Sequence, residues 1–176
     1  MMTKNKKPSV TDLLDLLNKP ALISWANKLG LQGIDVKQKR RKSLDAGTSI
    51  HVQIEAGVFE REIDAMSFAQ FLQGKEILSS EQDIETEWFV GRYDVHLSDG
   101  GIEYICDYKR GFKDKVYLEH KLQLIAYTMA IPARMALVPV PQFHLIPIEI
   151  HDRRPYEQML VHLSHIWQLK KEIESV

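Results

Sequence analysis

The sequence predicts a single mixed α/β domain in which helices flank a central sheet. Two observations carry this prediction: apolar residues recur at helical spacing through the first third of the chain, and two β-branched and aromatic segments follow in the middle. The chain has 176 residues, 44% of them hydrophobic and 27% charged, which suits one soluble domain with a hydrophobic core. We expect a helical lead-in over 1–75, the central sheet over 76–150, and a C-terminal helix over 151–176.

Four helices are predicted before the sheet. Ser9 or Thr11 is a suitable N-cap for the first, and Pro20 suits the first turn of the second. Glycines at 30, 57 and 74 are expected to follow the ends of the next three. The four helices are expected to span about 9–17, 20–30, 37–55 and 60–73.

The middle of the chain changes from helical to β spacing. The segments Trp88–Leu97 and Ile102–Lys109 are expected to be strands, joined by a hairpin turn at Ser98–Gly101. A helix near 116–130, strands at Met135–Val138 and Phe143–Ile150, and an amphipathic helix from about Pro155 are predicted to complete the domain.

The predicted hairpin brings two acids and a lysine together. If its turn centres on Asp99 and Gly100, Asp94 lies across from Ile105, and Asp107 is its diagonal neighbour. Because side chains alternate along a strand, Asp107 and Lys109 share a face with Ile105. A three-residue loop would invert the faces.

Two neighbouring carboxylates repel each other, and a divalent cation between them removes that repulsion. Such a cation can polarise a phosphodiester, and a lysine beside it can stabilise developing negative charge or help to activate water. The alternative is a structural ion pair between Asp107 and Lys109, which a lone Asp-x-Lys would favour. Asp94 on the same patch shifts the interpretation toward function.

Charge and cysteine content restrict the function classes. Residues 1–50 hold ten basic and four acidic residues, whereas the remainder holds thirteen basic and twenty acidic ones. This separation suits a protein that offers one face to a polyanion, although the basic cluster Lys37–Lys42 is equally well explained as a solvated start of a helix. The single cysteine, Cys106, excludes a disulfide within the chain and a multi-cysteine metal site. The N-terminus lacks the apolar stretch of a secretory signal, and no apolar run has the length of a membrane span, so we expect a cytosolic protein.

Several motifs resemble one nuclease superfamily. The segment Gly91–Asp94, followed by Asp107-Tyr108-Lys109, resembles the PD-(D/E)xK nuclease core, with Tyr93 in place of the usual proline. The segment Gln123–Tyr127 resembles the Gln-x-x-x-Tyr motif of the RecB-like subgroup, and Gly47–His51 resembles its upstream histidine motif. The likeness covers roughly residues 9–130, because the segments around Ser9–Thr11 and Pro20–Gly30 also look like the helical lead-in of phage-type RecB-like exonucleases.

The resemblance implies a restriction-endonuclease-like fold and a role for each matching residue. Metal ligands would be His51, Asp94, Asp107 and the backbone carbonyl of Tyr108. Lys109 would be the catalytic lysine, and Gln123 and Tyr127 would position it or the substrate. A further acid on the preceding strand often joins such sites; Glu81 is the candidate, with Glu85 and Glu87 as alternatives. His120, three residues before Gln123, could approach substrate but is better explained as a surface residue.

The resemblance therefore implies a Mg²⁺- or Mn²⁺-dependent deoxyribonuclease, favoured as an exonuclease or end-processing enzyme in DNA recombination, repair or replication. The likeness to phage-type exonucleases is compatible with a phage origin. Its partners would be DNA and other recombination or replication proteins, with no membrane; an oligomer is compatible with the sequence. Two alternatives stay open: a nuclease fold that binds DNA or protein without cutting, and a metal-independent structural protein whose acids pair with nearby bases.

Overall fold

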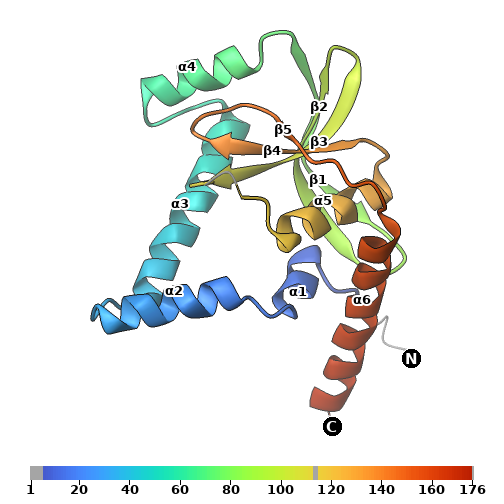
Figure 1. Cartoon of the computed structure of the whole chain (residues 1–176). Coiled ribbons are helices and arrows are strands. Elements are labelled where there is room, and N and C mark those ends of the chain that lie inside the picture. Colours follow the sequence, from blue (N-terminus) through green and yellow to red (C-terminus); the bar gives the residue numbers. More distant parts are fainter. Residues whose placement is uncertain (1–5, 113–114, 176) are drawn as a thin grey trace.

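A computed structural model describes residues 6–112 and 115–175, with the backbone alone at residues 20–21, 40 and 42–49. Along the described chain four helices come first, followed by three strands, a helix, two further strands and a final helix (Figure 1). The helices are α1 Val10–Asp15, α2 Pro20–Leu31, α3 Val36–Ala56, α4 Glu62–Phe71, α5 Leu118–Ala130 and α6 Arg154–Glu174. The strands are β1 Lys75–Glu85, β2 Val90–Asp99, β3 Ile102–Arg110, β4 Arg134–Val140 and β5 Ile146–Pro147.

The six predicted helices are confirmed within a few residues, and their ends follow local chemistry. Ser9 caps α1 in a capping box with Asp12, and Pro20 opens α2. Gly57 ends α3 in the left-handed conformation, which costs glycine little. The helix expected at 60–73 is shorter than predicted, since α4 is bounded by Arg61 and Leu72.

The five strands form one sheet in the order β1-β2-β3-β4-β5. The pairs β1–β2, β2–β3 and β4–β5 are antiparallel, whereas β3 and β4 are parallel and are connected through α5. A helical crossover is the usual way to join parallel neighbours. The predicted mixed α/β class, with a mixed sheet flanked by helices, is thus confirmed.

Two hydrophobic clusters cover the sheet. One contains residues of α1, α5 and α6, including Leu13, Leu122 and Leu160, which are fully buried. The other contains Ile50 of α3 and Phe68 of α4. Figure 1 shows α1, α5 and α6 grouped near one another, with α3 and α4 set apart from them. The sheet therefore lies between two packed layers.

The hairpin register differs from the prediction by two residues. Asp99 pairs with Ile102 and Val95 pairs with Cys106, so Gly100 and Gly101 form a two-residue loop. Both glycines have positive φ (58° and 80°), as a type I′ hairpin turn requires. The predicted turn at Asp99 and Gly100 is therefore wrong: Asp-Gly also suits a type I′ turn, but glycine adopts positive φ at lower cost than aspartate, which favours the Gly100-Gly101 pair.

The corrected register strengthens the predicted convergence of acids. His96, rather than Asp94, lies across from Ile105. The next level beyond the Val95–Cys106 pair belongs to Asp94 and Asp107, which are therefore facing positions instead of diagonal ones.

Strand β1 is expected from the family resemblance, which places Glu81 on a strand, and not from the spacing of its residues; it contains an irregularity. Ile77 pairs with Leu97 but Ser79 pairs with His96, so Leu78 is an extra residue, a β-bulge. The shift places Glu81, rather than Ser80, across from Asp94, between the pairs Ser80–Val95 and Gln82–Tyr93.

The strand predicted at Phe143–Ile150 is reduced to β5. Phe143 has a left-handed conformation (φ 43°), which breaks an extended chain.

Among the described residues no helix is both long and apolar enough to cross a membrane.

Candidate functional site

Three carboxylates lie at one level of the sheet, on three neighbouring strands. Glu81 of β1 lies across from Asp94 of β2, and Asp94 lies across from Asp107 of β3, as the registers above require. We call these three residues the acid row. Neighbouring strands are about 4.8 Å apart, so the row concentrates negative charge in a small volume.

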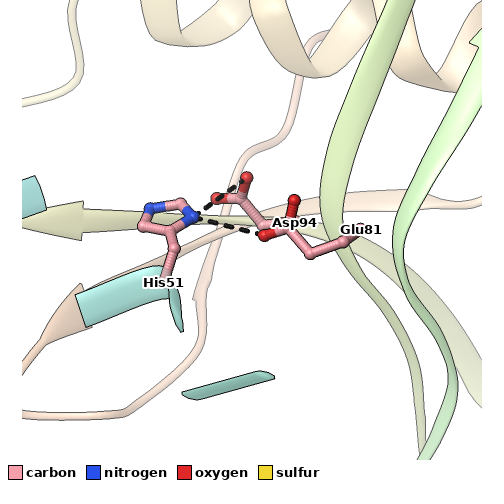
Figure 2. Close-up of side chains that lie close together, drawn as sticks. All are labelled: His51, Glu81 and Asp94. Carbon is pink, nitrogen blue, oxygen red and sulfur yellow. Dashed lines mark hydrogen bonds and ion pairs between the residues drawn. The ribbon is translucent and has the colours of Figure 1, made fainter. Parts of the chain in front are cut away.

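His51 reaches the acid row from helix α3. Its Nδ1 lies 3.4 Å from Glu81 Oε1 and 3.6 Å from Asp94 Oδ1 (Figure 2). One ligand atom from each of the three residues lies within 4.8 Å of the other two. The histidine that resembles the upstream family motif is thus brought beside the row. Of the Gly47–His51 motif, the side chains of residues 47–49 lie outside the described part of the chain.

Glu81 is held in an uncommon backbone conformation. Its φ is 48°, in the left-handed region that non-glycine residues seldom occupy. Such strain persists where the surrounding structure enforces it, and it clusters at functional sites. Of the three acids considered for this role, Glu81 is the one in the His51 group, whereas Glu85 is exposed and pairs with Lys7 at 2.6 Å. No contact assigns Glu87 to this group.

Asp94 is a buried carboxylate, and the surrounding charge is mostly unfavourable. Burial, the largest effect, and the nearby charge of Asp107 raise its pKa well above the usual value. The backbone N–H of Tyr108 donates a hydrogen bond of 2.7 Å to Asp94 Oδ2, which opposes that rise. The β2–β3 backbone pairing ends at Val95 and Cys106, and beyond it the Asp94 carboxylate accepts the hydrogen bond that a backbone carbonyl would otherwise accept from Tyr108. The predicted role of the Tyr108 carbonyl as a metal ligand stays a prediction, since the contact seen here uses the N–H of that residue.

Asp107 and Lys109 form a buried ion pair at the other end of the row. Lys109 Nζ lies 2.5 Å from Asp107 Oδ2, and the Asp107 side chain is only 3% exposed. The pair lacks the angles of a hydrogen bond, so Asp107 Oδ2 has no hydrogen-bond partner in the described part of the molecule. The Lys109 ammonium compensates the charge of Asp107, and because Oδ2 accepts no hydrogen bond it can still accept a further ligand.

Helix α5 holds Lys109 through a short relay. Lys109 Nζ donates to Gln123 Oε1 at 3.1 Å, and Gln123 Nε2 donates to the Tyr127 hydroxyl at 2.9 Å. The four-residue spacing of Gln123 and Tyr127 places both on one face of the helix, as the sequence motif predicts. The hydroxyl proton of Tyr127 is firmly held, since burial raises the pKa of this residue above its usual value.

The donor set fits a divalent cation. One imidazole nitrogen and two carboxylates come together at His51, Glu81 and Asp94, and Asp107 offers a buried oxygen without a hydrogen bond beside them. Oxygen-rich sites with one histidine suit hard cations such as Mg²⁺ and Mn²⁺. A bound cation would also offset the mutual repulsion that raises the pKa of Asp94.

His120 lies nearer the site than the sequence analysis indicates. Its ring is half-buried, and burial, followed by the charge of Lys109, lowers its pKa. Its Nδ1 accepts a hydrogen bond from the Tyr117 N–H at 3.4 Å. The signal in the sequence was its spacing of three residues from Gln123, which places both on one side of α5.

Comparisons with known proteins identify no family. No family model matches the chain, and no protein with a curated description matches it. Among solved structures, a crystal structure of SSO0001 is similar over 96% of this chain and 78% of that chain. The two share 19% sequence identity with a TM-score of 0.47, a likeness too distant to indicate activity.

Proposed function

We propose that the protein is a divalent-metal-dependent deoxyribonuclease with a restriction-endonuclease-like fold, a member of the PD-(D/E)xK superfamily. The observation that carries this proposal is the acid row with Lys109 two residues beyond Asp107. A structural role for these groups would place three acids at one level of a sheet, with Lys109 paired to Asp107 and Asp94 buried between two acids. Such a concentration of buried negative charge costs stability unless a ligand compensates it.

Hydrolysis of a phosphodiester makes three demands that these residues can meet. The phosphate must be held against a site of negative charge, water must attack phosphorus in line, and charge developing on the phosphate oxygens must be stabilised. A Mg²⁺ or Mn²⁺ ion held by His51, Glu81, Asp94 and Asp107 would neutralise the acids and polarise the phosphate.

Lys109 supplies the remaining positive charge. Its ammonium is aimed by Gln123, which is itself fixed by Tyr127, so the charge is positioned before substrate arrives. It would donate a hydrogen bond to a non-bridging phosphate oxygen, where negative charge grows during attack. The overall reaction adds hydroxyl to phosphorus and a proton to the departing sugar oxygen.

The likeness to the RecB-like motifs favours an exonuclease or end-processing enzyme. In that setting the protein would act on DNA in the cytosol during recombination, repair or replication, beside other proteins of those processes. A nuclease fold that binds DNA without cutting is the alternative, and the test below separates the two.

The test is cleavage of end-labelled linear DNA, single- and double-stranded, with Mg²⁺, with Mn²⁺ and with chelator. We expect metal-dependent cutting by wild type, and a loss of about a thousandfold or more in Lys109→Ala, since one preorganised charge contributes several kcal/mol to such a barrier. Lys171→Ala, on α6, is the control and should cut normally. Failure of folded wild type to cut any substrate with either metal would overturn the proposal and favour the binding module.

A further inference from the structure

The candidate site by itself repels its proposed substrate. The acid row carries three carboxylates against one lysine, and Lys109 is already paired with Asp107. Even with a divalent cation in place, little net positive charge would remain there to attract a polyanion. Non-specific affinity for DNA comes chiefly from lysine and arginine contacts to phosphates. Strong binding therefore requires basic residues outside the site.

A basic segment lies on the same helix that delivers His51. Residues 37–42 hold five basic side chains and no acidic one, and they fall in the first half of α3. Figure 1 shows α3 running from the sheet outward to α2, so its two ends occupy different parts of the molecule. The half of α3 nearer the sheet carries His51, whereas the half nearer α2 carries the five basic residues.

Among the residues of this segment whose side chains the structure describes, two lie on the His51 side of α3. Lys37 and Arg41 precede His51 by 14 and 10 residues. At 3.6 residues per turn these separations leave them about 40° and 80° from the direction of His51, and about 21 and 15 Å away along the axis. We call Lys37 and Arg41 the basic end of α3.

The basic end is available for contact. Both side chains are exposed, and no ion pair joins either of them to another residue whose side chain the structure describes. Their four-residue spacing also makes the two like charges neighbours, which is unfavourable without an anion between them. A phosphate backbone would supply that anion.

We propose that the basic end of α3 is an anchor for the DNA backbone, which holds the strand about four to six nucleotides from the bond at the acid row. The length follows from the separation of about 15–21 Å and a rise of about 3.4 Å per nucleotide. This inference rests on the proposed function for its substrate. It adds that the residues that hold the DNA lie at one end of α3, whereas the acid row that cuts it lies at the other end, beside His51.

The test measures DNA binding in an Asp107→Asn background with Mg²⁺, by anisotropy of a labelled duplex of about 20 base pairs at several salt concentrations. In Lys37→Ala/Arg41→Ala we expect roughly tenfold weaker binding, and a salt slope less steep by about 1.8 because the variant cannot neutralise two of the phosphates. For a hairpin whose duplex has about three base pairs, too short to reach α3, the two proteins should bind alike.

The control is Lys170→Ala/Lys171→Ala, which removes the same charge from α6. Equal losses in both double variants, or a loss in the α3 variant that is the same for short and long duplexes, would overturn the anchor. If wild type cuts DNA but the α3 variant binds like wild type, the anchor fails and the nuclease stands. If binding weakens as expected while wild type never cuts, the anchor stands and the nuclease fails.

Discussion

Two pairs of facing residues on β1 and β2 differ in how their charge is balanced. At one level Asp83 faces Arg92, and the guanidinium Nε lies 2.8 Å from the carboxylate. The Arg92 hydrogen bond and charge lower the pKa of Asp83. Two residues away along β1, Glu81 faces Asp94, acid against acid. Burial, followed by the charge of Asp107, raises the pKa of Asp94.

The difference shows where the chain supplies its own cation and where it does not. The exposed acid at 83 has an arginine directly opposite, whereas the buried acid at 94 has Glu81 on one side and Asp107 on the other. Burial should make an opposing charge more necessary, because unpaired buried charge is costly. The pattern is therefore typical of a site that binds a cation from solution.

The largest expected effect is on cutting. Asp107→Asn should reduce DNA cleavage by about a thousandfold or more, because it removes a proposed ligand and the partner of Lys109. Asp83→Asn makes the same chemical change at the level that has its own arginine, and it should leave the cleavage rate within about twofold. Similar losses in both variants would mean that the two levels do not differ in function. Rates on end-labelled DNA in Mn²⁺ decide between these outcomes.

A smaller loss is expected from Gln123→Ala. The change removes the acceptor that aims Lys109 and leaves the acid row intact. We expect cleavage to fall by about ten- to a hundredfold, the usual range for a residue that orients a catalytic group, with metal affinity unchanged. Gln142→Ala, in the loop before β5, is the matched control. Unaltered cleavage in Gln123→Ala would show that Gln123 does not position Lys109 for catalysis.

The pH dependence of stability should reveal Asp94. An acid whose pKa is raised in the folded state binds more protons there than in the unfolded chain, so its contribution to stability falls as pH rises above about 3.9. In chelator, wild type should lose stability relative to Asp94→Asn as pH increases from about 4 toward neutrality. Urea unfolding of both proteins across this interval measures the difference. A difference that stays constant with pH would show that Asp94 is not strained by its surroundings.

The smallest expected effect separates backbone strain from charge at Glu81. Both Glu81→Gly and Glu81→Ala remove the carboxylate, but glycine tolerates φ of 48° whereas alanine does not. We expect the glycine variant to be more stable by about 1 kcal/mol. At Gln82, which has ordinary strand geometry, the order should reverse by about 0.5–1 kcal/mol. Thermal unfolding of the four variants provides the comparison; alanine equal to glycine at 81 would exclude strain there.

Most of the helices and the β2–β3 hairpin could be predicted from the sequence, because they depend on local signals. Capping residues, proline and glycine mark the helices, and the Gly100-Gly101 turn marks the hairpin between β2 and β3. The convergence of Asp94, Asp107 and Lys109 survived a register error of two residues, since such a shift keeps every side chain on the same face.

The part that could not be predicted lies on β1. Its sequence is rich in serine and acidic residues, which have low β propensity, and the bulge at Leu78 interrupts its alternation. Whether Glu81 or Ser80 lies across from Asp94 depends on that single extra residue. Tertiary pairing fixes it, so the preference for Glu81 over Glu85 and Glu87 came from the family resemblance and not from a local pattern.

The central claim is that the acid row binds a divalent cation from solution. Titration calorimetry with Mn²⁺ tests this claim directly. We predict saturable binding by wild type and by Asp83→Asn, at least about tenfold weaker binding by Asp94→Asn, and stabilisation of wild type by about 2.7 kcal/mol at roughly a hundredfold excess over Kd. Equal Mn²⁺ affinity in wild type and Asp94→Asn, or no binding by folded wild type, would contradict it.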